Sequence, residues 1–186
     1  MSVTINTSSA LPVSGEQAFF VPTDVNTYQV HHALEASFGP RKKVGYLWSR
    51  NPVPGGSLCI VRCPEGYEPS AVAENDQWLF RLHGMVTQKS LSDGKHRAFR
   101  RAHHAPRYDW LTRRGGEHGF EVIAASIDVA REHIDKPGRP FFLDVSRFTG
   151  CLKVTDLSAF TGALRSGIGS GRAFGCGMLQ LLKRSV

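Results

Sequence analysis

The chain has 186 residues, enough for one compact domain or two very small ones packed together. Its hydrophobic content of 41% and charged content of 21% are ordinary for a globular protein, and no apolar run is long enough to span a bilayer. Residues 1–15 lack the basic start and apolar core of a secretory signal, so we expect a loose extension on a cytoplasmic protein. The four cysteines lack zinc-ribbon spacing, and no carboxylates cluster, so we predict neither a metal nor a cofactor.

Positive charge is concentrated in one segment. The formal net charge is +7 and the pI about 9.5, and residues 89–114 carry a positive excess that accounts for nearly all of it. A charge excess confined to one segment favours a nucleic acid over a merely solvated loop. The segment has no continuous apolar helical face, which argues against a membrane surface. The cations that we expect to bind phosphates are Lys95, Arg97, Arg100, Arg101, Arg113 and Arg114.

Residues 16–75 are expected to form a first module in the order strand, helix, strand, strand, short helix. The predicted ranges are 17–21, 23–38, 45–49, 58–62 and 69–74. Asp24 or Asn26 can cap the long helix, and Gly39 followed by Pro40 ends it. The stretch that follows the fourth of these elements is short, so we expect this module to be degenerate.

Residues 76–186 are expected to form a second, complete module. Strands are predicted at 77–84, 120–127, 147–155 and 177–183, and helices at 106–114 and from Asp156 to Gly167. The order is βαββαβ, that of a ferredoxin-like fold. The sequence therefore predicts an α+β protein of two tandem ferredoxin-like (RRM-like) modules, with a single larger α+β domain as the alternative.

A glycine-rich segment precedes the last predicted strand and reads G-I-G-S-G-R-A-F-G-C-G over residues 167–177. It follows a helix and precedes a strand, which excludes a dinucleotide fingerprint, and it lacks the Gly-Lys-Ser/Thr of a Walker loop. A flexible turn is the plain alternative, but glycine also lets backbone N–H groups approach phosphates closely. The candidate RNA-backbone residues are Gly167, Gly169, Gly171, Arg172, Gly175 and Gly177.

This segment, SGIGSGRAFGCGMLQLL, resembles the C-terminal signature of the CRISPR-associated repeat-processing endoribonucleases of the CasE type, in the RAMP superfamily. Collinear stretches agree from about Phe19 onward: the Tyr28–His31 tetrapeptide, the Phe80-Arg81-Leu82 strand, and the basic loop with its Trp110-Leu111 helix. The resemblance implies two ferredoxin-like modules that bind CRISPR repeat RNA, or crRNA, and join other subunits of a CRISPR effector complex.

Cleavage of RNA without metal requires proton transfer at the 2′-hydroxyl and at the leaving 5′-oxygen, which suits histidine. Tyr28 and His31 share one helix face, and the resemblance places the catalytic histidine at His31, with Tyr28 orienting or stabilising and His32 ranked second. It implies a metal-independent endoribonuclease that leaves a 2′,3′-cyclic phosphate and a 5′-hydroxyl and keeps its product. A non-catalytic crRNA-binding subunit is the main alternative. A single-strand RNA-recognition module lacks its RNP1 strand here, and the context of the glycines disfavours a nucleotide-binding enzyme.

Overall fold

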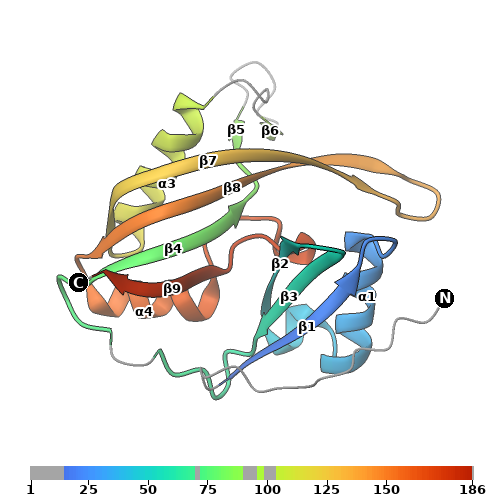
Figure 1. The fold of residues 1–186 in the computed structure, drawn as a ribbon, viewed down its shortest axis with the longest axis horizontal. Helices are drawn as coiled ribbons and strands as arrows, with labels where there is room; N and C mark the ends of the chain where they lie inside the picture. Colours follow the sequence, from blue (N-terminus) through green and yellow to red (C-terminus); the bar gives the residue numbers. More distant parts are fainter. Residues whose placement is uncertain (1–14, 70–71, 90–95, 99–103, 186) are drawn as a thin grey trace.

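The computed structural model describes residues 15–69, 72–89, 96–98 and 104–185. They form two main antiparallel sheets, each with its own helices, lying side by side, and a small two-stranded sheet (Figure 1). The protein is therefore an α+β protein of two modules, as predicted. Within the described ranges, every helix is too short or too polar to cross a membrane.

The N-terminal module consists of β1 (Glu16–Pro22), α1 (Thr27–Phe38), α2 (Arg41–Val44), β2 (Leu47–Val53) and β3 (Gly56–Arg62). Its sheet has the order β1-β3-β2, with β3 antiparallel to both neighbours. This is the arrangement of the first three strands of a ferredoxin-like module, and among the described residues no fourth strand joins the sheet. Within the described ranges this sheet thus has three strands, in line with the degenerate module expected from the sequence. The helix predicted at 69–74 is wrong at residues 69 and 72–74, which are not helical, while residues 70–71 lie outside the description.

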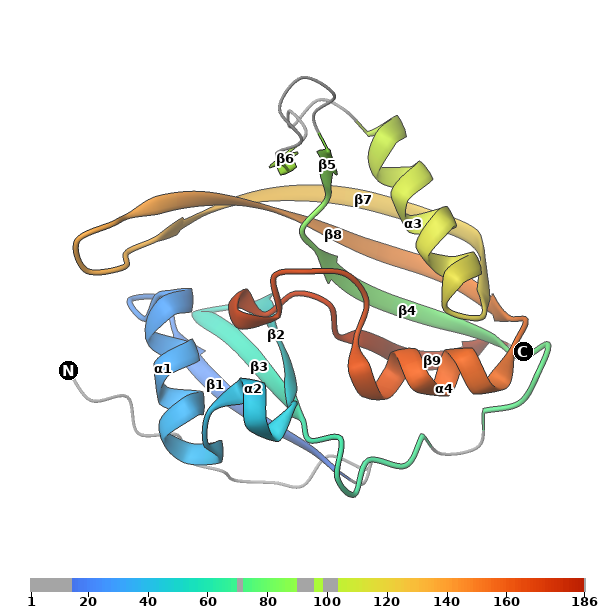
Figure 2. The same cartoon turned by 180° about the vertical axis from the view of Figure 1, so that it is seen from behind.

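Helix α1 begins four residues later than predicted because Asn26 is its cap. The Asn26 side chain accepts a hydrogen bond from the Gln29 N–H, and the Gln29 side chain accepts one from the Asn26 N–H, which completes a capping box. Val30 and Leu34 then face the sheet and join Trp48 and Val61 in a buried cluster. Figure 2 shows α1 covering one face of this sheet.

The C-terminal module has a complete βαββαβ order. Its elements are β4 (Gln77–Gly84), α3 (Ala105–Glu117), β7 (Phe120–Ile134), β8 (Phe141–Val154), α4 (Leu157–Ser166) and β9 (Leu179–Ser185). The sheet order β7-β8-β4-β9 is that of a ferredoxin-like fold. Two short strands, β5 (Thr87–Lys89) and β6 (His96–Ala98), pair between β4 and α3 and were not predicted.

Both helices of this module pack on the same face of the sheet. Phe80 and Leu82 alternate inward from β4 and meet Leu111 of α3 and Phe160 of α4 in one buried cluster. Trp110 stacks on Phe148 with ring centroids 5.7 Å apart. The Asp156 side chain caps α4 by accepting from the Ala159 N–H, as predicted.

Strands β7 and β8 run well past the ends predicted for them, 127 and 147. Strand β4 pairs with β8 only as far as Ser146, so residues 130–134 and 141–145 continue as a two-stranded ribbon. We call these residues the hairpin arm. It extends from the C-terminal sheet towards α1 of the N-terminal module (Figures 1 and 2).

Arg62 joins the two modules and is only 2% exposed. Its Nη1 donates to the carbonyl oxygens of Leu164 (2.8 Å) and Leu179 (2.9 Å), in α4 and β9. Its Nε donates to Glu16 Oε1 at 2.7 Å, and the guanidinium lies 4.2 Å from the centroid of the Tyr67 ring. One buried guanidinium thus bridges β1, β3, α4 and β9.

The four cysteines are free. Cys59 is buried in the N-terminal core, and Cys176 is buried at the end of the glycine-rich segment. Burial raises the pKa of Cys59 to about 12 and also raises the pKa of Cys176. Both are therefore held as neutral thiols at pH 7.

Candidate nucleic-acid interface and catalytic helix

A groove with a volume of about 1400 Å³ lies between α3 and the glycine-rich segment. Arg113 and Arg114 line it from α3, and Gly167, Gly169 and Arg172 line it from the segment. Residues from two parts of the chain that are more than 50 positions apart, proposed separately as phosphate binders, therefore face one concave surface. Its remaining lining includes Met85, Trp110, His118 and Ser170, of which Trp110 and Ser170 belong to stretches singled out in the sequence.

The glycines are first of all required by the backbone of the segment itself. Its five glycines have φ between 74° and 90°, a region that favours glycine. A Cβ on Gly167 would lie 2.8 Å from Leu47 Cδ2, and one on Gly177 would lie 2.9 Å from the Ile168 carbonyl oxygen. The segment therefore packs closely against the N-terminal module at Gly167 and against itself at Gly177, in a way that a side chain would prevent.

Not every glycine N–H is available to a ligand, contrary to the simple interpretation of the sequence. The Gly167 N–H donates to the Ala163 carbonyl (2.8 Å), and the Gly177 N–H donates to the His83 carbonyl (2.7 Å). For Gly169, Gly171 and Gly175, the described part of the chain supplies no acceptor. Of these three, Gly169 lines the groove, so it is the best-placed N–H donor for a phosphate.

Arg172 opens the short 3-10 helix η1 (Arg172–Phe174) in the middle of the segment. Its Nη2 donates weakly to the Gly167 carbonyl at 3.4 Å, and its Nε is buried with no hydrogen-bond partner among the described residues. Burial, and then the nearby Arg41, lower the pKa of this guanidinium. Arg172 and Ser166 also line a second pocket of about 450 Å³ with Arg41, Lys42 and Arg165. The positive surface thus continues from the groove to α2.

The arginines of α3 differ in their environments. Arg113 and Arg114 each bond Glu117, at 2.7 and 2.6 Å, and these hydrogen bonds, that from Arg114 first, lower the Glu117 pKa. Arg107, by contrast, is buried, and its Nε donates to Ser146 Oγ at 2.9 Å. The number of cations in the basic segment therefore overstates the positive charge on the surface, because the Arg107 guanidinium is buried inside the C-terminal module.

Other predicted phosphate binders lie partly or wholly outside the description. The backbone of Arg97 belongs to β6, while Lys95, Arg100 and Arg101 lie outside the described residues. Their proposed role stays a prediction.

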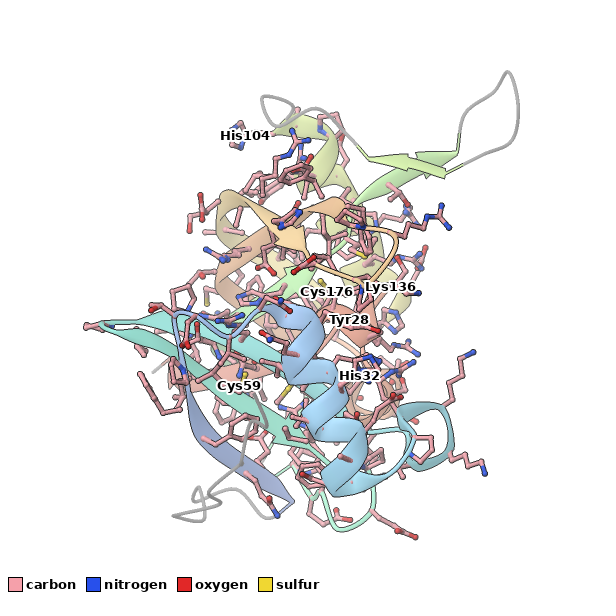
Figure 3. The ribbon with its side chains drawn as sticks, turned by 90° about the vertical axis from the view of Figure 1, so that its right-hand side faces the viewer. Tyr28, His32, Cys59, His104, Lys136 and Cys176 are labelled. Atoms are coloured by element: carbon pink, nitrogen blue, oxygen red, sulfur yellow. The ribbon has the colours of Figure 1, made fainter. Side chains whose placement is uncertain are left out.

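Tyr28 lies in the first turn of α1, where the two modules meet. It packs against a buried cluster formed by Ile134, Leu143 and Val145 of the hairpin arm and by Cys176. Figure 3 shows Tyr28 and His32 on α1, with Tyr28 on the side towards Cys176. The Tyr28 and His32 rings meet edge to face, with centroids 4.3 Å apart. In the free protein, Tyr28 is therefore in ring contact with His32.

His31 is the more enclosed of the two histidines. Its side chain is 16% exposed, its Nε2 lies 3.7 Å from Glu35 Oε2, and its Nδ1 is buried where the described part of the chain supplies no hydrogen-bond partner. Burial lowers the pKa of His31, opposed by Glu35 and assisted by His32 and Arg41. The imidazole is thus neutral at pH 7 and able to accept a proton.

Neither Tyr28 nor His31 lines the groove, but the helix that carries both lies against the segment that forms its wall. Helix α1 contacts η1. Arg41 lies near enough to lower the pKa of both His31 and Arg172. The run Arg41-Lys42-Lys43 was not singled out in the sequence, although three successive cations were a usable signal. Among the described residues, no group of three or more His, Cys, Asp or Glu side chains could hold a metal ion.

Comparison with known proteins agrees with this architecture. Solved structures with the same fold include Thermus thermophilus Cse3 bound to an RNA representing a pre-cleavage complex, with TM-score 0.75, 21% identity, and coverage of 92% of this chain and 100% of that chain. Another is the Cas6e protein of Escherichia coli K-12, with TM-score 0.68, 19% identity, and coverage of 89% and 97%. A chain of a CRISPR RNA-guided surveillance complex matches with TM-score 0.64, 17% identity, and coverage of 89% and 97%. The fold is thus that of the tandem ferredoxin-like proteins.

The family follows from the sequence match. Residues 59–183 match the family described as CRISPR associated protein, and the chain belongs to that family. No curated protein sequence matches the chain.

Proposed function

We propose that this protein binds the hairpin of a CRISPR repeat in precursor crRNA and cleaves it as a metal-independent endoribonuclease. The proposal is carried by one observation: the basic face of α3 and the glycine-rich segment line one groove, and α1, which carries the histidines, contacts η1 of that segment. Proteins of the same fold include a CRISPR endoribonuclease, Cse3, bound to a 19-nucleotide RNA.

In this proposal the groove holds the RNA by its backbone. Arg113 and Arg114 of α3 donate hydrogen bonds to the phosphates of one RNA strand. Gly169 and Arg172, in the glycine-rich segment, contact the opposite RNA strand. A duplex of A-form RNA is recognised mainly by its shape and backbone, which suits a groove lined by cations and N–H donors.

The chemistry is assigned to α1. Neutral His31 accepts the proton of the 2′-hydroxyl, whose oxygen attacks the adjacent phosphorus while the bond from phosphorus to the 5′-oxygen breaks. The leaving 5′-oxygen takes up a proton from solvent water, and the products are a 2′,3′-cyclic phosphate and a 5′-hydroxyl. Tyr28 orients the reacting groups through its hydroxyl. RNA must rearrange the surroundings of His31, because its ring is largely covered in the free protein.

The test compares three histidine variants on the cognate repeat RNA in a chelating buffer. His31→Ala is expected to abolish cleavage while RNA binding is kept, and His133→Ala, which changes an exposed histidine of the hairpin arm, serves as the matched control. Cleavage by His31→Ala at the wild-type rate with loss in His32→Ala would transfer the role to His32. A wild-type protein that binds the repeat tightly but does not cut it would establish the non-catalytic crRNA-binding subunit instead.

We also propose that the protein keeps its product and joins a larger assembly. A protein of the same fold is part of a CRISPR RNA-guided surveillance complex. Co-purification of crRNA with the tagged protein and other effector subunits would test this directly, and isolation of the protein alone after cleavage would contradict it.

A further inference from the structure

The hairpin arm is a two-stranded ribbon that depends on other elements for its stability. Past Ser146, strand β8 loses its pairing with β4 and continues over residues 141–145, roughly 17 Å of extended chain. A ribbon of two strands is at best marginally stable in water unless one face packs on something else. Here that face is the side of Ile134, Leu143 and Val145, which are buried together with Cys176 and against Tyr28.

Glu132 lies on this same inward face. It pairs across the arm with Leu143, so both side chains leave the ribbon on one side. An apolar side chain would satisfy packing at such a position, and a carboxylate that is only 24% exposed is costly unless it is bonded. Its presence therefore needs a specific partner.

The partner is the catalytic helix. Glu132 Oε2 accepts a hydrogen bond from Thr27 Oγ1 at 2.9 Å, and its other oxygen lies 3.6 Å from Arg147 Nη2 in an ion pair. Thr27 is the first residue of α1 and is buried. It precedes Tyr28 directly and shares a helix face with His31, four residues later.

We infer that Glu132 is a positioning residue, which fixes the first turn of α1 against the C-terminal module and so sets where Tyr28 and His31 stand relative to the glycine-rich segment. This inference rests on the proposed function. The Tyr28 contact is apolar and permits sliding, whereas a hydrogen bond has a defined length and direction. Arg147 holds the carboxylate in turn, since its Nη1 also lies 3.6 Å from Asp128 Oδ2. The contacts that run from Arg147 through Glu132 to Thr27 thus link the C-terminal sheet to α1.

The experiment removes each side of the hydrogen bond in the full-length protein. Glu132→Ala and Thr27→Val are each expected to slow single-turnover cleavage roughly tenfold, because misplacement of a reacting group by about 1 Å lowers the reaction rate strongly. The Kd for a repeat RNA carrying a 2′-deoxy group at the cleaved position should stay within about twofold. The double variant should be no slower than either single variant, since both remove the same bond.

Conservative variants separate positioning from mere folding. Thr27→Ser and Glu132→Gln each keep a bond between positions 27 and 132 and should restore cleavage to within about threefold of wild type. Glu121→Ala, which removes an exposed carboxylate of the same strand, is the matched control. A rate unchanged in Glu132→Ala, or a Kd that weakens in step with the rate, would overturn the inference.

A readout without RNA keeps the inference distinct from the proposed function. The imidazole NMR signals of His31 in the free protein should move in Glu132→Ala and Thr27→Val but not in Glu132→Gln. If wild-type protein fails to cut repeat RNA, the proposed function fails while these signals still decide whether Glu132 positions α1. Signals identical in all variants would refute the positioning role.

Discussion

Replacing Arg62 by alanine is expected to cost this protein a large part of its stability. The change leaves the Glu16 carboxylate, itself 10% exposed, without its hydrogen bond and ion pair. It also removes the donors to the carbonyls of Leu164 and Leu179 and the cation over the Tyr67 ring. Removal of one partner from a buried ion pair costs about 3–5 kcal/mol. Total stabilities of proteins of this kind are about 5–15 kcal/mol, so the loss is severe.

The loss is measurable by urea unfolding followed through tryptophan fluorescence and by thermal melting. A loss of that size lowers Tm by roughly 6–20 °C, at roughly 2–4 °C per kcal/mol for a chain of this length. The control is Arg165→Ala, which breaks an exposed pair with Glu68 and should cost about 0–1 kcal/mol. If Arg62→Ala lost no more than this control, the buried guanidinium would not be what joins the modules.

Three further predictions concern the candidate site. In Glu35→Gln, the His31 pKa should fall further because the negative charge that opposes the effect of burial is gone. The NMR titration curve of His31 and the acid limb of the pH–rate profile for cleavage should both shift to lower pH. A shift to higher pH would contradict the assignment of His31. Gly167→Ala should destabilise the protein by about 1–3 kcal/mol through strain, whereas Gly162→Ala, in open space on α4, should stabilise it by up to about 1 kcal/mol, both read from urea unfolding. Arg114→Ala should weaken RNA binding and reduce its salt slope by about one, and an unchanged slope would remove Arg114 from the phosphate contacts.

Local patterns in the sequence predicted most of the elements that carry the site. Strand β4 has the predicted bounds because Phe80 and Leu82 alternate strictly into one core, and the cap of α4 at Asp156 is read directly from its neighbours. The outer part of β7 carries no comparable pattern. Its inward side chains include the charged Glu132, and its structure depends on pairing with β8 and on contacts with α1, which are distant in sequence.

The candidate site shows more clearly what local sequence patterns cannot predict. The sequence placed both His31 and His32 within helical reach of Tyr28, three and four residues later, and the structure shows the ring contact with His32. A count of charges could not separate buried Arg107 from Arg113, six residues later and exposed. The choice between the two histidines depends on side-chain rotamers, and the difference between the two arginines depends on tertiary packing; spacing along one helix encodes neither.

The position of Cys176 gives the interface between the glycine-rich segment and α1 its own chemical reporter. A thiol reacts as its thiolate, and the raised pKa and full burial of Cys176 suppress that form in the closed protein. Alkylation at this cysteine must therefore wait until the segment separates from Tyr28 and the hairpin arm. Its labelling rate, set against that of Cys59 in the N-terminal core, measures how often α1 and the glycine-rich segment separate in solution.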